Sequence, residues 1–247
     1  AVDVQNASDS IKQEIKITIT EDVCSFIDTD ISGNVFEDLT LYNICTPYNI
    51  TGDLLVGNGA TLTIEPGVKL NFEGPHSIKV DGGFLKAIGT ETDSITITGI
   101  SWRGIDVKSA GSEIKYARII DEGNSGQGDY LVKLSGSHID NSHIFGGYRG
   151  VELRDSSIVS RSRIHDIRKE AVSAYERSVA YGNTIYDVGT EEEWSPAVMS
   201  YDGSYIVNNR IYSTMQNPNM VAVGSQNGGY IGGNTIGADR GIHGKFG

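Results

Sequence analysis

The stretches Ser157-Ile-Val-Ser-Arg-Ser-Arg-Ile164 and Ser178-Val-Ala-Tyr-Gly-Asn-Thr-Ile185 are two copies of one repeating unit. Further units with the same pattern lie at residues 112–119, 137–144, 204–211 and 229–236. Their last isoleucines fall at 119, 144, 164, 185, 211 and 236, in steps of 25, 20, 21, 26 and 25 residues. A period in the low twenties, without the fixed leucines of a leucine-rich repeat, is typical of one turn of a parallel β-helix.

A second strand precedes each unit, as in Leu131-Val-Lys-Leu134 and Val151-Glu-Leu-Arg154. Alternation of apolar and polar residues indicates strands with one side in a core. We therefore expect an all-β, right-handed parallel β-helix, a single-stranded solenoid of roughly 8–10 coils. In-register stacking would let the side chains of one turn position hydrogen-bond up a ladder, and this position holds Ser142, Ser162, Asn183, Asn209 and Asn234.

Upstream of these units the pattern changes, and its motifs point to a known class. They are Ala60-Thr-Leu-Thr-Ile-Glu-Pro-Gly-Val68, the Gly-x-Leu-x-Ala-x-Gly of residues 83–89, Ile95-Thr-Ile-Thr98 and Trp102-Arg-Gly-Ile105. They resemble the right-handed parallel β-helix repeat proteins of bacterial and archaeal surfaces, within the pectate-lyase-like superfamily. The resemblance covers residues 49–247, and residues 1–48 are expected to form an N-terminal strand and capping region. It implies the fold and leaves the function open, because that superfamily contains lyases, epimerases, adhesins and structural proteins.

The composition limits the classes of binding partner that we expect. The formal net charge is −12, so a duplex nucleic acid is not an expected partner, because binding phosphates requires a basic surface. No apolar run approaches about 18 residues, so we expect no membrane span. Because the chain starts at Ala1 with no basic leader, we interpret it as a mature, secreted, extracellular protein located at the cell surface.

Two further features fit export. Cys24 and Cys45 are the two cysteines of the chain, and such an isolated pair predicts one disulfide, the alternative being two buried free thiols. Asn6-Ala7-Ser8 and Asn49-Ile50-Thr51 fit the N-glycosylation pattern, which makes Asn6 and Asn49 candidate glycan acceptors.

Positions next to the repeating isoleucine form two columns in a stacked fold. The residue before it is Arg118, His143, Arg163, Thr184, Arg210 or Thr235, and the residue after it is Ile120, Phe145, His165, Tyr186, Tyr212 or Gly237. Guanidinium groups bind carboxylates, and aromatic rings accept sugars. An acidic polysaccharide is therefore a candidate ligand of Arg118, His143, Arg163, Arg210, Tyr186 and Tyr212. The alternative is an ordinary solvated strand surface.

Catalysis has weaker support, and we assign no catalytic residue. Asp166 and Asp187 occupy equivalent positions in adjacent coils and could contribute to a calcium site, with His165, Arg163 and Lys169 nearby as bases of a polysaccharide lyase. Calcium is the one cofactor we consider, but it needs six or more oxygen ligands. The alternative is that both aspartates form turns.

The two ends of the chain suggest self-assembly. Ile15, Ile17 and Ile19 alternate with polar residues as in an amphipathic strand, and we expect Ile242 and Phe246 to lie in a strand at the other end of the sequence. An uncapped solenoid exposes an unpaired strand edge that another copy can extend. Our first hypothesis is therefore an extracellular structural subunit that forms a head-to-tail homopolymer, as a surface filament or sheath. The alternative is an anionic-polysaccharide-binding protein or lyase.

The predicted disulfide can be tested directly. Mass spectrometry of non-reduced peptides from the secreted protein is expected to find Cys24 linked to Cys45. Recovery of both cysteines as free thiols would exclude the bond.

Overall fold

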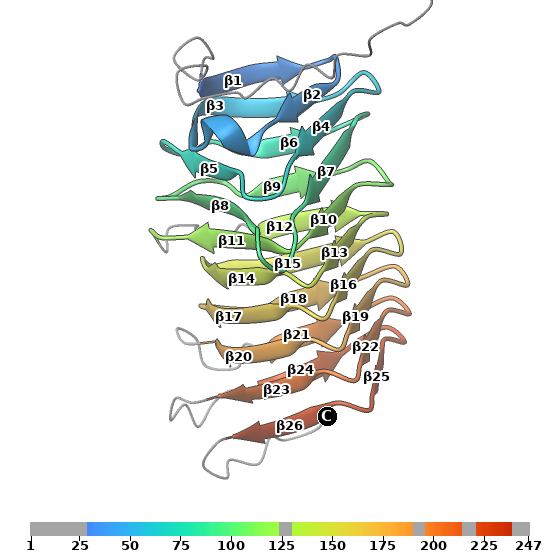
Figure 1. Ribbon diagram of the computed structural model, residues 1–247. Coiled ribbons are helices and arrows are strands. Elements are labelled where there is room, and N and C mark those ends of the chain that lie inside the picture. Colours follow the sequence, from blue (N-terminus) through green and yellow to red (C-terminus); the bar gives the residue numbers. More distant parts are fainter. Residues whose placement is uncertain (1–28, 124–129, 190–195, 214–220, 239–247) are drawn as a thin grey trace, which may run out of the picture.

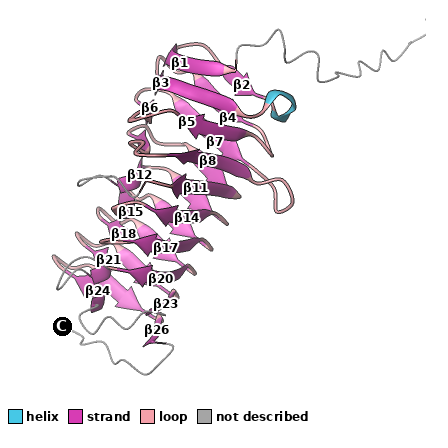
Figure 2. Ribbon diagram, turned by 90° about the vertical axis from the view of Figure 1, so that its left-hand side faces the viewer, coloured by secondary structure: helices cyan, strands magenta, loops and turns pink. Residues whose placement is uncertain are grey.

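The structure is a computed structural model that describes residues 29–123, 130–189, 196–213 and 221–238. The chain is an all-β, right-handed parallel β-helix of about eight turns, as the repeat predicts (Figure 1). Each complete turn contributes one short strand to each of three faces, and every strand pairs in parallel with its equivalent in the next turn. The first described strand and β26 lie at opposite ends of the stack (Figure 2).

The strands of face 1 follow the repeating isoleucine position. They are β5 (Lys69–Phe72), β8 (Ile95–Gly99), β11 (Ala117–Asp121), β14 (His143–Gly146), β17 (Arg163–Ile167), β20 (Thr184–Val188), β23 (Arg210–Ser213) and β26 (Thr235–Ala238). Face 2 consists of β6 (Ile78–Val80), β9 (Ile105–Val107), β12 (Tyr130–Ser135), β15 (Arg149–Arg154), β18 (Val172–Ala174), β21 (Pro196–Ser200) and β24 (Val221–Ser225). Two strands, β1 (Asp30–Val35) and β3 (Tyr48–Val56), run across both faces and join them at the N-terminal end.

Face 3 is a separate nine-stranded sheet. Its strands are β2 (Leu39–Leu41), β4 (Thr61–Ile64), β7 (Phe84–Ile88), β10 (Glu113–Lys115), β13 (His138–Asp140), β16 (Ile158–Ser160), β19 (Val179–Tyr181), β22 (Tyr205–Val207) and β25 (Tyr230–Gly232). A 3-10 helix, η2 (Asn43–Cys45), lies between β2 and β3. The stack begins upstream of the expected start at residue 49, because β1 pairs with β3 and β2 pairs with β4.

The core is a set of aligned apolar columns. On face 1 the isoleucines at 97, 119, 144, 164, 185 and 211 lie in one register and are fully buried. The branched side chains of successive coils pack directly on one another, and each fully buried side chain contributes roughly 1.5–3 kcal/mol of hydrophobic free energy. The repeating isoleucines of the sequence are therefore the residues that form the core on face 1.

The predicted turn ladder is confirmed. The amide of Ser142 donates to Ser162 Oγ (3.1 Å), that of Ser162 to Asn183 Oδ1 (2.9 Å), and that of Asn183 to Asn209 Oδ1 (2.8 Å). Asn209 continues the chain by donating its amide to Asn234 Oδ1 at 2.8 Å. These side chains satisfy buried backbone donors at the turn that connects face 3 to face 1, where no strand ladder can reach them.

A parallel series of serines lines the turn between faces 2 and 3. The amide of Leu85 donates to Ser112 Oγ (2.9 Å), that of Ser112 to Ser137 Oγ (3.1 Å), and that of Ser137 to Ser157 Oγ (3.1 Å). Two corners of the coil thus carry side-chain ladders.

The ladder predicts a graded loss of stability at Asn183. In Asn183→Ala the amide of Ser162 loses its acceptor and the carbonyl of Val159 loses a donor, and we expect the free energy of unfolding to fall by about 2–4 kcal/mol. Asn183→Ser keeps a hydroxyl acceptor like that of Ser162 and should lose less. Urea denaturation would measure both, with Asn71→Ala, on the outer surface of β5, as the matched control. Equal stability of the alanine and serine variants would contradict the ladder's importance.

Candidate functional site

Face 1 carries the two predicted columns, and their register is confirmed. Arg118, His143 and Arg163 occupy the same position in β11, β14 and β17, and Thr184 and Arg210 continue it. We call this line of positions the cation column. The positions two residues later hold Phe145, His165, Tyr186 and Tyr212, which we call the ring column.

The ring column is a continuous stack. Phe145 and His165 lie 5.1 Å apart between ring centroids at an angle of 4°, and His165 and Tyr186 lie 4.5 Å apart at 13°. Tyr186 and Tyr212 follow at 5.3 Å and 10°. The inner rings therefore use both faces against one another, and only their edges and hydroxyl groups face outward. This differs from the expected sugar platform, because Tyr186 is stacked on both faces, and Tyr212 packs against Tyr186 and has the Arg210 guanidinium over its ring at 4.8 Å from the centroid.

Two histidines connect the columns. His165 is buried, and its Nδ1 lies 2.7 Å from Asp166 Oδ2. Its Nε2 lies 2.5 Å from Nε2 of His143. In the arrangement in which His165 Nδ1–H donates to the carboxylate and His165 Nε2 accepts, His143 Nε2–H is the donor of the second bond. The pair fixes the orientation of the His143 ring at the edge of the cation column.

Burial, followed by the charges of His165, Arg163 and Arg118, lowers the pKa of His143 from 6.5 to about 4. His143 is therefore neutral near pH 7, and the arginines supply the positive charge of this part of the column. A neutral imidazole between two cations also avoids the repulsion that three adjacent charges would create.

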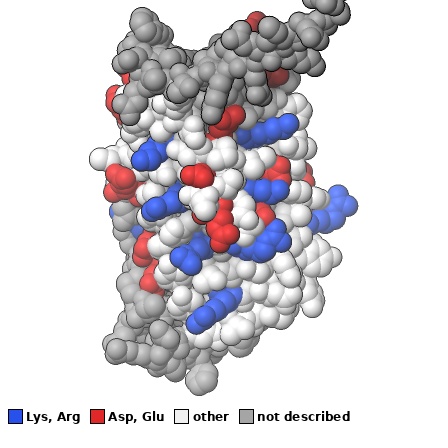
Figure 3. Space-filling view, in the orientation of Figure 1, with Lys and Arg blue, Asp and Glu red and all other residues white. Residues whose placement is uncertain are grey.

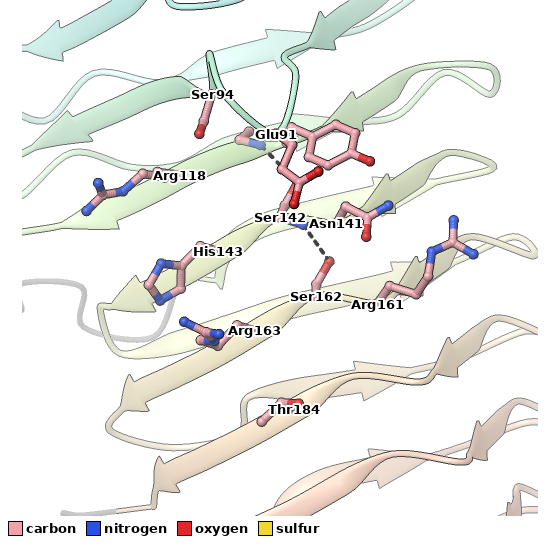
Figure 4. A pocket seen from close by; sticks show the side chains of 12 residues that line it. Glu91, Ser94, Arg118, Asn141, Ser142, His143, Arg161, Ser162, Arg163 and Thr184 are labelled. Atoms are coloured by element: carbon pink, nitrogen blue, oxygen red, sulfur yellow. Dashed lines mark hydrogen bonds between the residues drawn. The ribbon is translucent and has the colours of Figure 1, made fainter.

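A groove of about 520 Å³ runs along one side of the cation column. Arg118, His143 and Arg163 form one wall, and the turn residues Asn141 and Arg161 lie opposite them (Figure 4). The turn residue Tyr116 also lines the groove. These three turn residues have the left-handed backbone conformation, each with φ near 46°. Glu91 and Ser94, from the loop after β7, also line the groove. The dashed bond between Ser142 and Ser162 in Figure 4 marks its floor, which is the turn ladder itself.

The two walls differ in charge. Arg161 is paired with Asp140 at 2.5 Å. Burial opposes ionisation of Asp140, but hydrogen bonds from Arg161 and Ser160 outweigh it and hold its pKa below the usual value. Arg118 and Arg163 are exposed and form no ion pair with any described residue. Figure 3 shows basic side chains at several heights of this side of the solenoid, with acidic ones between them. The free guanidinium groups make the first wall a candidate anion-binding surface.

The predicted calcium pair is brought to adjacent turns. Asp166 and Asp187 both have the left-handed conformation, with φ of 53° and 51°, directly after the ring column. The Asp166 carboxylate contacts His165. Among the described residues there is no group of three or more His, Cys, Asp or Glu side chains that could hold a metal ion. Calcium at these aspartates stays a prediction.

Other predicted residues lie outside the described ranges. These are Asn6, Ile15, Ile17, Ile19, Cys24, Ile242 and Phe246, so the disulfide and the head-to-tail contact stay predictions. Cys45 is buried in η2. Asn49 lies in β3 and donates its side-chain amide to Asp30 Oδ1 at 2.9 Å, a bond that a glycan on Asn49 would have to replace. The described part of the chain has no helix with the length and apolar character of a membrane span.

The sequence did not indicate a second polar cluster on face 2. Tyr175 and Tyr201 stack at 4.5 Å and 3°, and Arg154 lies 4.4 Å from the centroid of Tyr175. Arg149 and Glu170 form an ion pair at 2.9 Å beside them. The repeat could have revealed this cluster, because three of its residues occupy equivalent positions in successive coils. Arg154, Tyr175 and Tyr201 each follow the last core position of their strand.

Comparison with known proteins adds little to this geometry. No family model matches the chain, and no solved structure shows a significant match. A segment of 65 residues is 38% identical to Protein bark beetle of Drosophila melanogaster. That segment is 26% of this chain and only 2% of the length of the fly protein. The structure places the chain in the class of parallel β-helix proteins, and its relation to the pectate-lyase-like superfamily or to bacterial and archaeal surface proteins stays a prediction.

The half-buried position of His143 predicts a pH-dependent stability. Its pKa is about 4 in the folded chain and 6.5 otherwise, so the unfolded chain binds the proton more readily between these values. The contribution of His143 is thus present above pH 6.5 and is lost as the pH falls towards 4. We expect it to amount to roughly 1–2 kcal/mol after allowance for solvent screening.

Thermal or urea denaturation from pH 7 to 4 would measure this contribution as the difference between the wild type and His143→Gln. The control is His138→Gln, a change at an exposed histidine on face 3. If His143→Gln follows the same pH dependence as the wild type, the histidine pair does not carry the effect.

Proposed function

We propose that this chain binds an anionic polysaccharide along the groove and the cation column of face 1. The observation that carries the proposal is the pair of exposed arginines, Arg118 and Arg163, that have no described carboxylate partner in a protein of net charge −12. In an acidic protein many carboxylates are available as partners, but the ion pairs among the described residues involve cations other than Arg118 and Arg163. Guanidinium groups left open along a groove suit the carboxylates or sulfates of a ligand.

The shape favours a linear polymer over a small molecule. Small-molecule sites usually enclose most of the ligand surface, whereas this groove is open and Arg210 extends the same column beyond it. The hydroxyl groups of Tyr186 and Tyr212 lie beside the column and can hydrogen-bond to sugar hydroxyls. Several weak contacts in a row give useful affinity for a chain that presents its anionic groups repeatedly. A polysaccharide ligand agrees with the extracellular location that the sequence predicts.

A lyase is the alternative, and one observation favours it. His143 is a neutral imidazole between two arginines, an arrangement that can remove a proton next to a carboxylate whose charge the arginines stabilise. Its low pKa makes it a weak base at neutral pH. Binding without turnover is therefore the function we propose. Incubation with pectate or alginate distinguishes the two, because elimination creates an unsaturated uronate that absorbs ultraviolet light.

Removal of the free charges should weaken binding. For Arg118→Gln combined with Arg163→Gln we expect the Kd for a polyuronate to rise roughly tenfold to thirtyfold, because each exposed charged contact contributes about 1 kcal/mol. The salt dependence of binding should also decrease. Titration calorimetry at two salt concentrations would measure both effects.

The matched control is Arg103→Gln, which removes an exposed arginine outside the groove. Wild-type protein that binds neither uronates nor sulfated glycans would refute the proposed function. An equal loss of affinity in the control would show that only net charge matters.

A further inference from the structure

The cation column extends beyond the groove and follows a strict alternation. The register of face 1 continues it upstream through Thr96 to Lys69 and downstream through Arg210 to Thr235. Over eight successive strands the column reads Lys69, Thr96, Arg118, His143, Arg163, Thr184, Arg210 and Thr235. A permanent cation stands on every second coil, and an uncharged side chain stands between each pair, because His143 is neutral.

The cations of this column share a second property. Lys69, Arg118, Arg163 and Arg210 are exposed, and none forms an ion pair with a described residue. The residues between the cations, Thr96, His143 and Thr184, are half-buried. The column therefore presents exposed positive charges that are separated by uncharged, less exposed side chains.

The outward columns of the other two faces have a different arrangement of charge. On face 2 the outward column alternates opposite charges, Lys79, Asp106, Lys133 and Glu152 in successive strands. On face 3, Lys86 is opposite Glu113 and Lys115 is opposite Asp140. Opposite charges on adjacent strands stabilise a sheet by roughly 0.2–1 kcal/mol per pair. Stability alone would therefore favour acidic residues between the cations of face 1, and none is present.

The spacing of the charges follows from the coil rise. Neighbouring strands lie about 4.8 Å apart, so cations on alternate coils lie about 9.6 Å apart along the solenoid axis. In an extended polysaccharide, one sugar ring has a length close to one coil rise, and a disaccharide has a length close to two. The repeat of the cation column is thus close to the disaccharide repeat of such a chain.

We infer that the cation column recognises a linear glycan with one anionic group per disaccharide, extended parallel to the solenoid axis. Each anionic group would lie against one cation, and each neutral sugar against one of the half-buried residues between them. A glycan with a carboxylate on every sugar would place alternate carboxylates beside Thr96, His143 and Thr184, where no cation pairs with them. This inference rests on the proposed function and adds the class of glycan.

Glu91 lies over the groove and bears on the same inference (Figure 4). Its carboxylate repels an anionic chain there, and a densely charged polymer would experience more of this repulsion than one with alternating charge. Glu91, in the loop after β7, therefore favours the same class of glycan as the spacing of the cations does.

A charge-conserving exchange tests the spacing. Arg163→Thr combined with Thr184→Arg keeps the number of cations and the composition of the column but destroys the alternation. The probes are hyaluronan oligosaccharides, with one carboxylate per disaccharide, and alginate oligosaccharides of equal length, with one carboxylate per sugar. Affinities would be measured by calorimetry for the wild type, the single variant Arg163→Thr and the exchange variant. Unchanged thermal midpoints would establish that the variants fold.

We expect the wild type to prefer hyaluronan and the single variant to bind both probes more weakly, by roughly fivefold for one lost exposed contact. The exchange variant should recover the affinity for alginate, in which a carboxylate is available at every coil. Its affinity for hyaluronan should stay as low as that of the single variant.

Recovery of both affinities by the exchange would show that only the number of cations matters, and would overturn the inference while leaving the proposed function intact. A wild-type preference for alginate would overturn it in the same way. Failure of the wild type to bind either probe, or any sulfated glycan, would remove the proposed function as well.

Discussion

The whole molecule depends on one constraint, the in-register pairing of each strand with its equivalent in the next coil. Parallel backbone hydrogen bonds fix the separation of neighbouring coils at about 4.8 Å. They also make every sequence position part of a column, since side chains in equivalent positions must lie next to one another. A residue in this fold is therefore selected together with the residues above and below it. The core, the turns and the outer surface are three results of that same rule.

Inside the coil the rule favours repetition. Identical isoleucines pack well on each other because their shapes match at the coil spacing, and buried serines and asparagines can bond to the amide of the preceding coil. The change from Ser162 to Asn183 along the ladder preserves an acceptor at the same place. Loop lengths can differ between coils, as the steps of 20 to 26 residues show, because the loops lie outside the paired strands.

Outside the coil the same rule creates a difficulty, because repetition of a charge along a column is repulsive. Faces 2 and 3 resolve it by alternating acid and base, whereas face 1 alternates base with uncharged residues. The first solution stabilises the sheet, and the second leaves charge available to a ligand. The ring column beside it is stabilised by stacking of its own members.

The sequence by itself determined the coil, the register and therefore the columns, because a repeated isoleucine identifies equivalent positions without any knowledge of the loops. It identified Arg118, Arg163 and Arg210 as neighbours on one surface although they lie far apart in the chain. Only the tertiary structure decided what surrounds them. The turn residues that form the opposite wall of the groove, and the loop that brings Glu91 over it, occupy positions whose direction depends on backbone conformation rather than on strand alternation. The ring faces were likewise decided in three dimensions, since rings at the coil spacing gain more by stacking on one another than by facing solvent.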